Sequence, residues 1–234
     1  MIICKYKKVG VGAFYSHLIV LRTFSMAIRR AGIEINYSQG FNPHELIYFS
    51  QPLSIGIDSY AEYLCVDSQL NATEFKELLN KTLPSCIEIL GAKNIIKNPN
   101  LAAKSCAAQY MIDFKTDINQ EYINSIQISD SHKIEIFKNG QVETKEIRDR
   151  ILDIRALDST KIITTLTCGN ENLRADLLAK SIASQSKIKA DSIDISKHVM
   201  YAYNVDAIKE PIFSSASSIV MSNRNLYDLE LYIQ

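Results

Sequence analysis

The strongest constraint on the fold is the order in which strand-like and helix-like segments alternate along the N-terminal half of the chain. Short apolar runs of alternating character predict strands at 2–9, 46–50, 61–67 and 87–96. Apolar residues at helical spacing predict helices between them, at 17–31 and 73–83. This order, β-α-β-β-α-β, is that of a ferredoxin-like half, in which two helices cover one face of an antiparallel sheet.

The first helix has the clearest boundaries. Ser16 precedes it as an N-cap, and Gly32 is placed to end it in a left-handed conformation. Gly10 and Gly12 lie before it, in a pattern that is compatible with a dinucleotide-binding turn. The third glycine of that pattern would fall at Tyr15, whose side chain would block close approach of the helix. An ordinary strand-to-helix turn is therefore favoured.

The C-terminal half repeats the order less regularly, after a linker that contains Pro99. Strands are predicted at 107–114, 132–138, 141–147, 161–168 and 193–205, and helices at 119–126 and 172–182. The segment 150–157 fits either a strand or a helix, 206–218 is predicted as a loop, and 219–234 is undecided. Asn139-Gly140 predicts a hairpin turn.

These segments predict an α+β fold of two ferredoxin-like (βαββαβ) halves, with antiparallel sheets and helices on one face. The first domain is expected at 1–98. The second is expected at 99–234, with the hairpin as an insertion.

Composition narrows the class of protein. The 234 residues are 47% hydrophobic, so we expect a sizeable core. They carry no formal net charge, so we expect no overall electrostatic attraction to nucleic acid. The five cysteines are spread along the chain, and no disulfide framework, metal site or bound cofactor is expected. Neither a membrane-spanning apolar run nor a signal peptide is recognised, so the cytoplasm is the expected location.

Residues 37–56, YSQGFNPHELIYFSQPLSIG, hold an unusual density of groups that can contact a ligand. The glycine and the Asn-Pro pair predict a tight turn near the start of this stretch. The candidate binding residues in the turn are Ser38, Gln39, Asn42 and His44. The alternative is a turn that is only structural.

A second group of candidates surrounds the first helix. Ser16 and His17 would lie at its N-terminus, where the dipole and the free N–H groups favour an anion. Arg22 and Arg29 share a helix face and could bind phosphate or carboxylate, or form a solvated stripe. Glu62 could orient a histidine or an arginine. One hypothesis brings the histidines, Arg22 and the turn together at one end of the first domain.

Several short runs at characteristic spacing carry a family resemblance. They are Tyr15-Ser16-His17-Leu18, Arg22, Arg29-Arg30-Ala31-Gly32, the run from Tyr37 to His44, Pro52-Leu53 with Gly56, and Glu62-Tyr63. In these runs the chain resembles the radical-SAM-linked or radical-SAM-associated proteins of unknown function (DUF2344). The family usually has an aspartate where this chain has Ile19, so any role of that carboxylate is missing here.

The resemblance implies a partnership with a radical-SAM enzyme, often of the B12-dependent type, and with RNA or a ribosome-related substrate. The chain lacks the clustered cysteines that hold a [4Fe–4S] cluster, so it is not itself such an enzyme. Our first hypothesis is therefore an accessory or substrate-binding protein. The alternative is an RNA-modifying enzyme with a pseudouridine-synthase-like fold, which needs an acid such as Glu62 or Asp58. Whether the chain is an enzyme stays open, and no membrane partner is expected.

Stacking of RNA bases on a sheet is a further possibility that the sequence suggests. The tyrosines that could stack are Tyr110, Tyr201 and Tyr203. Tyrosines in strands are, however, common as ordinary packing residues. No motif of an RNA-binding ferredoxin-like domain accompanies them.

Overall fold

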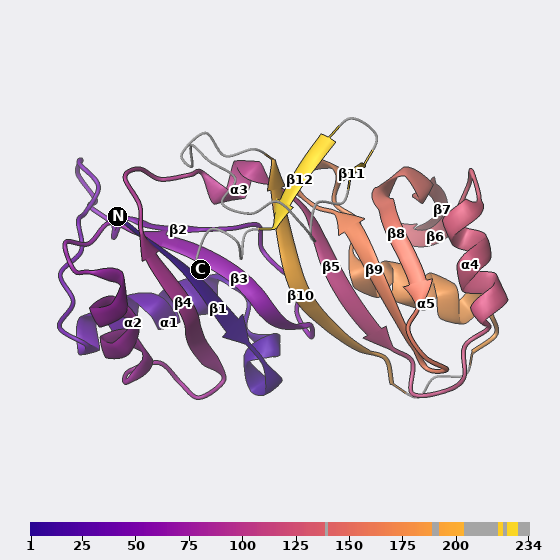
Figure 1. The fold of residues 1–234 in the computed structure, drawn as a ribbon, viewed down its shortest axis with the longest axis horizontal. Coiled ribbons are helices and arrows are strands. Elements are labelled where there is room, and N and C mark those ends of the chain that lie inside the picture. Colours follow the sequence, from indigo (N-terminus) through magenta and orange to yellow (C-terminus); the bar gives the residue numbers. More distant parts are fainter. Residues whose placement is uncertain (139, 189–191, 204–219, 222–223, 229–234) are drawn as a thin grey trace. The chain divides into compact units, whose positions relative to one another are not determined.

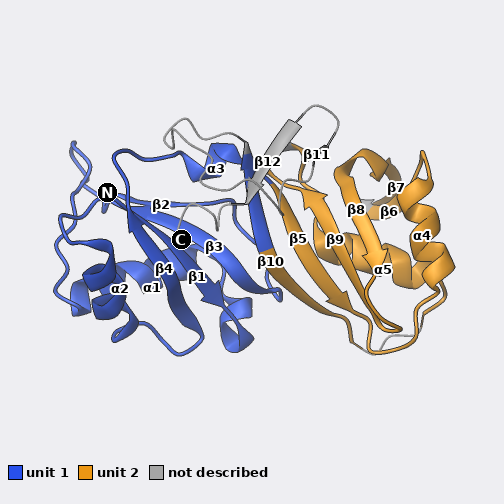
Figure 2. Ribbon diagram, viewed as in Figure 1, with its two compact units in different colours: residues 1–106, 199–234 blue, residues 107–198 orange. Residues whose placement is uncertain are grey.

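The structure, a computed structural model, describes residues 1–138, 140–188, 192–203, 220–221 and 224–228. It contains two compact units, shown in different colours in Figure 2. Unit 1 consists of Met1–Cys106 and the described residues from Val199 onward, and unit 2 is Ala107–His198. This division differs from the expected one at 98/99. Residues 101–106 belong with unit 1 because Leu101 packs in its core and the Ser105 hydroxyl donates to Met200 Sδ, 3.3 Å away.

Unit 1 has the expected order of elements, labelled in Figure 1. They are β1 (Ile2–Lys8), α1 (His17–Arg30), β2 (Ile47–Phe49), β3 (Asp58–Val66), α2 (Ala72–Asn80) and β4 (Ile87–Asn94). A 3-10 turn, η1 (Gly10–Phe14), precedes α1, and a short helix, α3 (Leu101–Lys104), follows β4. The strands lie in the order β4-β1-β3-β2, and each neighbouring pair is antiparallel.

The two long helices of unit 1 pack on the same face of its sheet. Residues of α1 and α2 share one buried cluster with alternate residues of β1, β3 and β4. Phe24 lies at its centre, with its ring centroid 4.9 Å from Tyr6 and 5.8 Å from Phe49. The other face of β1 and β3 packs against Leu101 and Met200. Both faces of the central strands are therefore buried.

The ends of α1 follow from local chemistry, as the sequence predicts. The Ser16 hydroxyl accepts a hydrogen bond from the Ile19 amide at 3.4 Å. At the other end, Gly32 has a φ of 65°. There the Ile33 amide donates to the Ile28 carbonyl at 3.1 Å, which satisfies a carbonyl that the helix leaves open.

Unit 2 combines a sheet, two helices and a hairpin. Its elements are β5 (Ser105–Asp113, of which the first two residues belong to unit 1), α4 (Gln120–Ile128), β6 (Lys133–Lys138), β7 (Gln141–Glu146), β8 (Ile151–Ala156), β9 (Lys161–Thr167), α5 (Ala175–Gln185) and β10 (Asp194–Tyr203, of which 199–203 belong to unit 1). Strand β9 pairs antiparallel with β5 and with β8, and β10 is the neighbour of β5 on the other side. β6 and β7 form a separate two-stranded sheet. The undecided segment 150–157 is thus mostly a strand.

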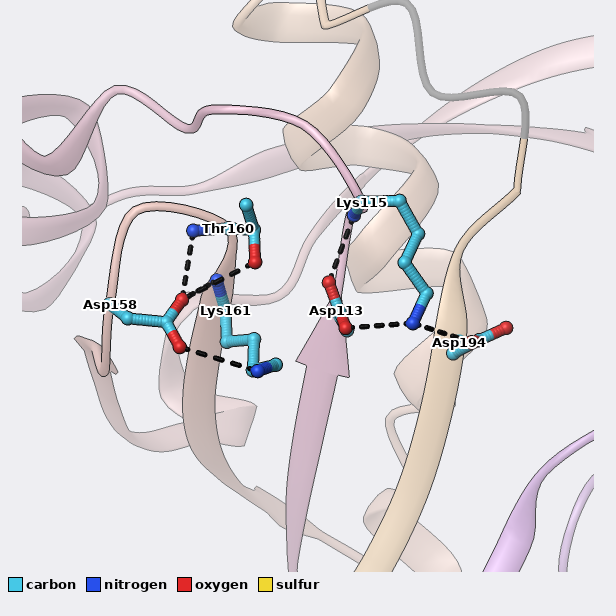
Figure 3. A network of polar contacts seen from close by, with 6 residues as sticks. All are labelled: Asp113, Lys115, Asp158, Thr160, Lys161 and Asp194. Carbon is cyan, nitrogen blue, oxygen red and sulfur yellow. Dashed lines mark hydrogen bonds and ion pairs between the residues drawn. The ribbon is translucent and has the colours of Figure 1, made fainter.

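Ion pairs and hydrogen bonds of charged side chains connect the strand ends of unit 2, as Figure 3 shows. The Lys115 ammonium lies 2.8 Å from Asp113 Oδ2 and 2.9 Å from Asp194 Oδ2. The hydrogen bonds to these carboxylates raise the pKa of Lys115 to about 12. Asp158 accepts the backbone amides of Thr160 and Lys161, each at 2.8 Å, and so closes the turn before β9. The network is explained by this structural role.

The coarse prediction of an α+β fold with a mostly antiparallel sheet is confirmed. Tyr110 and Tyr201 are buried, so neither offers a face for base stacking, and the side chain of Tyr203 lies outside the described residues. The loop predicted at 206–218 also lies outside them. At the C-terminal end, β11 (Val220–Met221) pairs with β12 (Arg224–Asp228), which pairs with β10. Within the described part of the chain, no helix is long and apolar enough to cross a bilayer.

Candidate functional site

Residues 38–44 form a loop that its own hydrogen bonds close. A β-bridge joins Tyr37 to Glu45 at its base. The Ser38 amide donates to the His44 carbonyl at 2.8 Å, and the His44 amide donates to the Ser38 hydroxyl at 3.0 Å. The same hydroxyl lies 2.8 Å from His44 Nδ1. The loop therefore has a defined shape before any ligand binds.

The tip of this loop is open to solvent. Gln39, Asn42 and His44 are exposed, and the side chain of Phe41 is fully exposed. A fully exposed phenylalanine on a closed loop gains nothing from the fold of its own chain, because its apolar surface stays in water. Sequence reasoning concentrated on the polar residues of the turn and missed Phe41. Its position between Gly40 and Asn42, where no core residue could sit, was the available signal.

An ion pair attaches the loop to the C-terminal turn of α1. Arg29 Nε donates to Glu45 Oε1 at 2.7 Å, and the Tyr37 hydroxyl approaches the same oxygen at 3.4 Å. The hydrogen bond to Glu45 raises the pKa of Arg29. A cavity of about 400 Å³ lies beside this group, which is enough for a small organic molecule. Its lining residues are Ile28, Arg29, Ile33, Glu34, Ile35, Asn36, Tyr37, Glu45, Asp67, Ser68 and Gln69.

A second, much smaller hollow lies at the N-terminal end of α1. Its volume is about 20 Å³, room for roughly one water molecule. Glu62 and His17 both line it, together with the buried Lys8. Glu62 accepts a hydrogen bond from the Ser59 hydroxyl at 2.7 Å, and Lys8 Nζ donates to the Ala13 carbonyl at 3.3 Å. Sequence reasoning missed Lys8, although the alternation of β1 places it on the same side of the strand as Cys4 and Tyr6.

Aromatic rings form part of the lining of the small hollow. The His17 ring meets Phe49 edge to face, with 5.4 Å between ring centroids. Burial, and then the Glu62 carboxylate, raise the pKa of Tyr6 well above its usual value. The lining of this hollow therefore includes a carboxylate, an ammonium, an imidazole and a phenol group.

The structure does not gather the candidate residues around one hollow. His17 is the first residue of α1. His44 is next to Glu45, which pairs with Arg29, twelve residues further along the helix. At 1.5 Å per residue this separation is roughly 18 Å. The lining residues of the two hollows do not overlap. Arg22 is exposed between them and lines neither, and Ser16 acts as the helix cap.

Metal binding finds no support among the residues that the structure describes. They contain no group of three or more His, Cys, Asp and Glu side chains placed to hold an ion. The five cysteines are thiols and not disulfides, and all but Cys168 are buried. Burial raises the pKa of Cys65 to about 12, so this thiol is held neutral.

The fold and these features define an α+β protein whose first unit presents a preformed surface loop and two separate hollows. The model of a family described as an uncharacterised protein conserved in bacteria (DUF2344) matches residues 2–175, and the chain belongs to this family. None of the curated proteins matches the chain.

Proposed function

We propose that the protein is a cytoplasmic accessory protein that binds substrate or partner for a radical-SAM enzyme. This enzyme would act on RNA or a ribosome-related substrate and would include the B12-dependent type. The observation that carries this proposal is the closed loop 38–44 with Phe41 at its tip. Membership of the DUF2344 family supports it, since the matched residues 2–175 include the run from Tyr37 to His44 that forms this loop.

Preorganisation explains why such a loop suits recognition. A loop that is already closed loses little conformational entropy on binding, so more of the contact energy appears as affinity. Aromatic side chains are frequent anchors of protein interfaces because they bury a large area with few rotatable bonds. Phe41 would supply the apolar anchor, and Gln39, Asn42 and His44 the polar contacts around it.

Affinity purification under anaerobic conditions tests the proposal. The full chain carries a tag and is recovered from a bacterium that encodes it. We expect a radical-SAM enzyme to co-purify with the wild-type chain and to be depleted in Phe41→Ala. Ile96→Ala, which removes another almost fully exposed apolar residue of unit 1, should retain it. Recovery of no radical-SAM enzyme by the wild-type chain would refute the proposal.

We also propose that both units are ferredoxin-like halves. The strand order β4-β1-β3-β2 supports this for unit 1, and β10-β5-β9-β8 supports it for unit 2 when the β6–β7 hairpin is treated as an insertion. Paired halves of this kind agree with the pseudouridine-synthase-like plan, but only as an analogy of fold.

The small hollow favours a second candidate function, an RNA-modifying enzyme. Glu62 is a buried carboxylate that lines the same hollow as the His17 imidazole, and general acid–base catalysis uses groups of these two kinds. Asp58 is the weaker candidate, because it accepts the Gly10 amide at 2.8 Å and so supports the turn before α1. A hollow of about 20 Å³ would have to open to admit a base. Under this candidate, Glu62→Gln abolishes an RNA modification that mass spectrometry detects in cells, whereas the exposed Glu88→Gln does not.

A further inference from the structure

We propose that the outer face of α1 is a docking surface for an acidic amphipathic helix of a partner protein. The surface, called here the α1 outer stripe, consists of Leu18, Ile19, Arg22 and Met26. The inference rests on the proposed accessory function and names the chemistry of the partner. It concerns a face of the helix that neither hollow includes.

Helix geometry places the stripe opposite the core. Val20, Phe24, Ala27 and Ile28 are the buried residues of α1. Leu18, Arg22 and Met26 recur at intervals of four and share the opposite face over roughly 12 Å, with Ile19 beside them. Leu18, Ile19 and Met26 are 55%, 44% and 57% exposed. The solvent-exposed face of a helix is usually charged or polar. Three exposed apolar side chains on this face therefore indicate an interaction surface.

Charge indicates the sign of the partner. α1 contains three arginines and neither aspartate nor glutamate. Arg29 is paired with Glu45, and Arg30 donates to the Thr82 carbonyl at 2.8 Å. Among the described residues, nothing forms a hydrogen bond or ion pair with the Arg22 guanidinium in the middle of the stripe. A carboxylate on the partner would complement it, and the planar guanidinium can hold that carboxylate with two hydrogen bonds.

The composition of the stripe favours a protein over RNA. Protein interfaces are enriched in Met and Arg and depleted in Lys, Glu and Asp, and the stripe follows this pattern. Single-stranded RNA instead binds where basic groups track its backbone and aromatic rings stack on its bases. The stripe has one arginine and no aromatic residue. The whole chain has no formal net charge that would attract RNA.

A helix is the partner element that fits best. A stripe of roughly 12 Å equals about two helical turns, the length over which a facing helix presents apolar anchors at i, i+4 and i+7. Its aliphatic anchors would pack between Leu18, Ile19 and Met26. Its acidic residues would meet Arg22 at the centre of the contact. Because the contact is small, we expect weak binding for an isolated helix, with Kd in the micromolar range or above.

Binding of designed peptides to the full chain tests the inference. The probes are a 20-residue helical peptide of leucine and glutamate with leucine at i, i+4 and i+7, the same peptide with lysine for glutamate, and a 20-nucleotide single-stranded RNA. Fluorescence anisotropy at low salt measures each Kd. We expect the acidic peptide alone to bind. Arg22→Glu should weaken it at least roughly tenfold, because charge reversal places like charges together. Met26→Ser should weaken it roughly fivefold through lost apolar contact.

Matched changes elsewhere in unit 1 serve as controls. Lys97→Glu reverses an exposed charge and Ile96→Ser removes an exposed aliphatic side chain, and both should leave the Kd within about twofold. Thermal unfolding of each variant confirms that it is folded. Equal binding of the acidic peptide by wild type, Arg22→Glu and Met26→Ser would overturn the inference. RNA binding that Arg22→Glu abolishes would overturn it in favour of a nucleic-acid surface.

The two proposals can fail separately. A radical-SAM enzyme that co-purifies equally with wild type and Arg22→Glu would retain the accessory function and remove the stripe as its docking surface. Peptide binding at the stripe without any co-purifying radical-SAM enzyme would retain the stripe and remove the proposed function.

Discussion

Replacing Ser38 with alanine should open the binding loop without unfolding unit 1. The hydroxyl accepts the His44 amide at 3.0 Å and contacts His44 Nδ1 at 2.8 Å, so the change removes both interactions across the loop. Each such hydrogen bond contributes about 0.5–1 kcal/mol at an exposed site, or about 1–2 kcal/mol together. The Ser38 amide still donates to the His44 carbonyl, and the Arg29–Glu45 ion pair still holds the base of the loop.

Amide hydrogen exchange reads this change directly. A loss of about 1–2 kcal/mol corresponds to roughly 5- to 30-fold faster exchange at the His44 amide, because each 1.4 kcal/mol is a factor of ten. Binding of the co-purifying partner should weaken within the same range, since the partner must then order the loop. Ser38→Thr keeps a hydroxyl and should restore most of the protection, and the exposed Ser85→Ala should have no effect. Unchanged exchange at His44 in Ser38→Ala would refute the account of a preformed loop.

Other consequences concern the framework around the site. Phe24→Ala should destabilise unit 1 by about 3–5 kcal/mol in urea unfolding, because it empties the centre of the aromatic cluster. Gly12→Ala should destabilise the chain by about 1–3 kcal/mol in the same assay, since its Cβ would lie 3.0 Å from the Cys86 carbonyl oxygen. Hydrogen bonds from the Ser131 hydroxyl and then from the His132 and Arg148 amides lower the pKa of Glu146 from 4.5 to about 2. A lowered folded-state pKa stabilises the fold above the unfolded value, so the advantage of wild type over Glu146→Gln in urea should fall as pH drops from 4.5 to 2.

Local signals predicted the helices and strands well where they were strong. Ser16 and Gly32 mark the ends of α1 because caps depend only on neighbouring residues. α3 was missed because its four residues are about one helical turn and show no periodicity. α5 begins at Ala175 and not at 172, because the Leu173 amide donates to the Thr167 carbonyl and keeps this residue outside the helix. This hydrogen bond between Leu173 and Thr167 depends on how the chain folds back after β9, which the local sequence pattern does not show.

The arrangement of the candidate residues was beyond the reach of the sequence for the same reason. His17 and His44 both lie near the ends of predicted elements. The sequence does not show, however, which end of α1 the turn that carries His44 contacts. The Arg29–Glu45 ion pair, between residues sixteen positions apart, decides this. It brings the turn to the C-terminal end of the helix and leaves His17 with Glu62 at the other. The binding roles of the nine candidate residues stay predictions.

Photocross-linking from the tip of the loop tests the central claim most directly. Phe41 is replaced in living cells by a photoreactive phenylalanine analogue, and the adducts formed on illumination are identified by mass spectrometry. The same analogue at Ile96 serves as the comparison, because that side chain is also almost fully exposed. Our account predicts a covalent adduct with a radical-SAM enzyme from position 41 and none from position 96. Adducts from position 41 that contain no radical-SAM enzyme, or the same adducts from both positions, would contradict it.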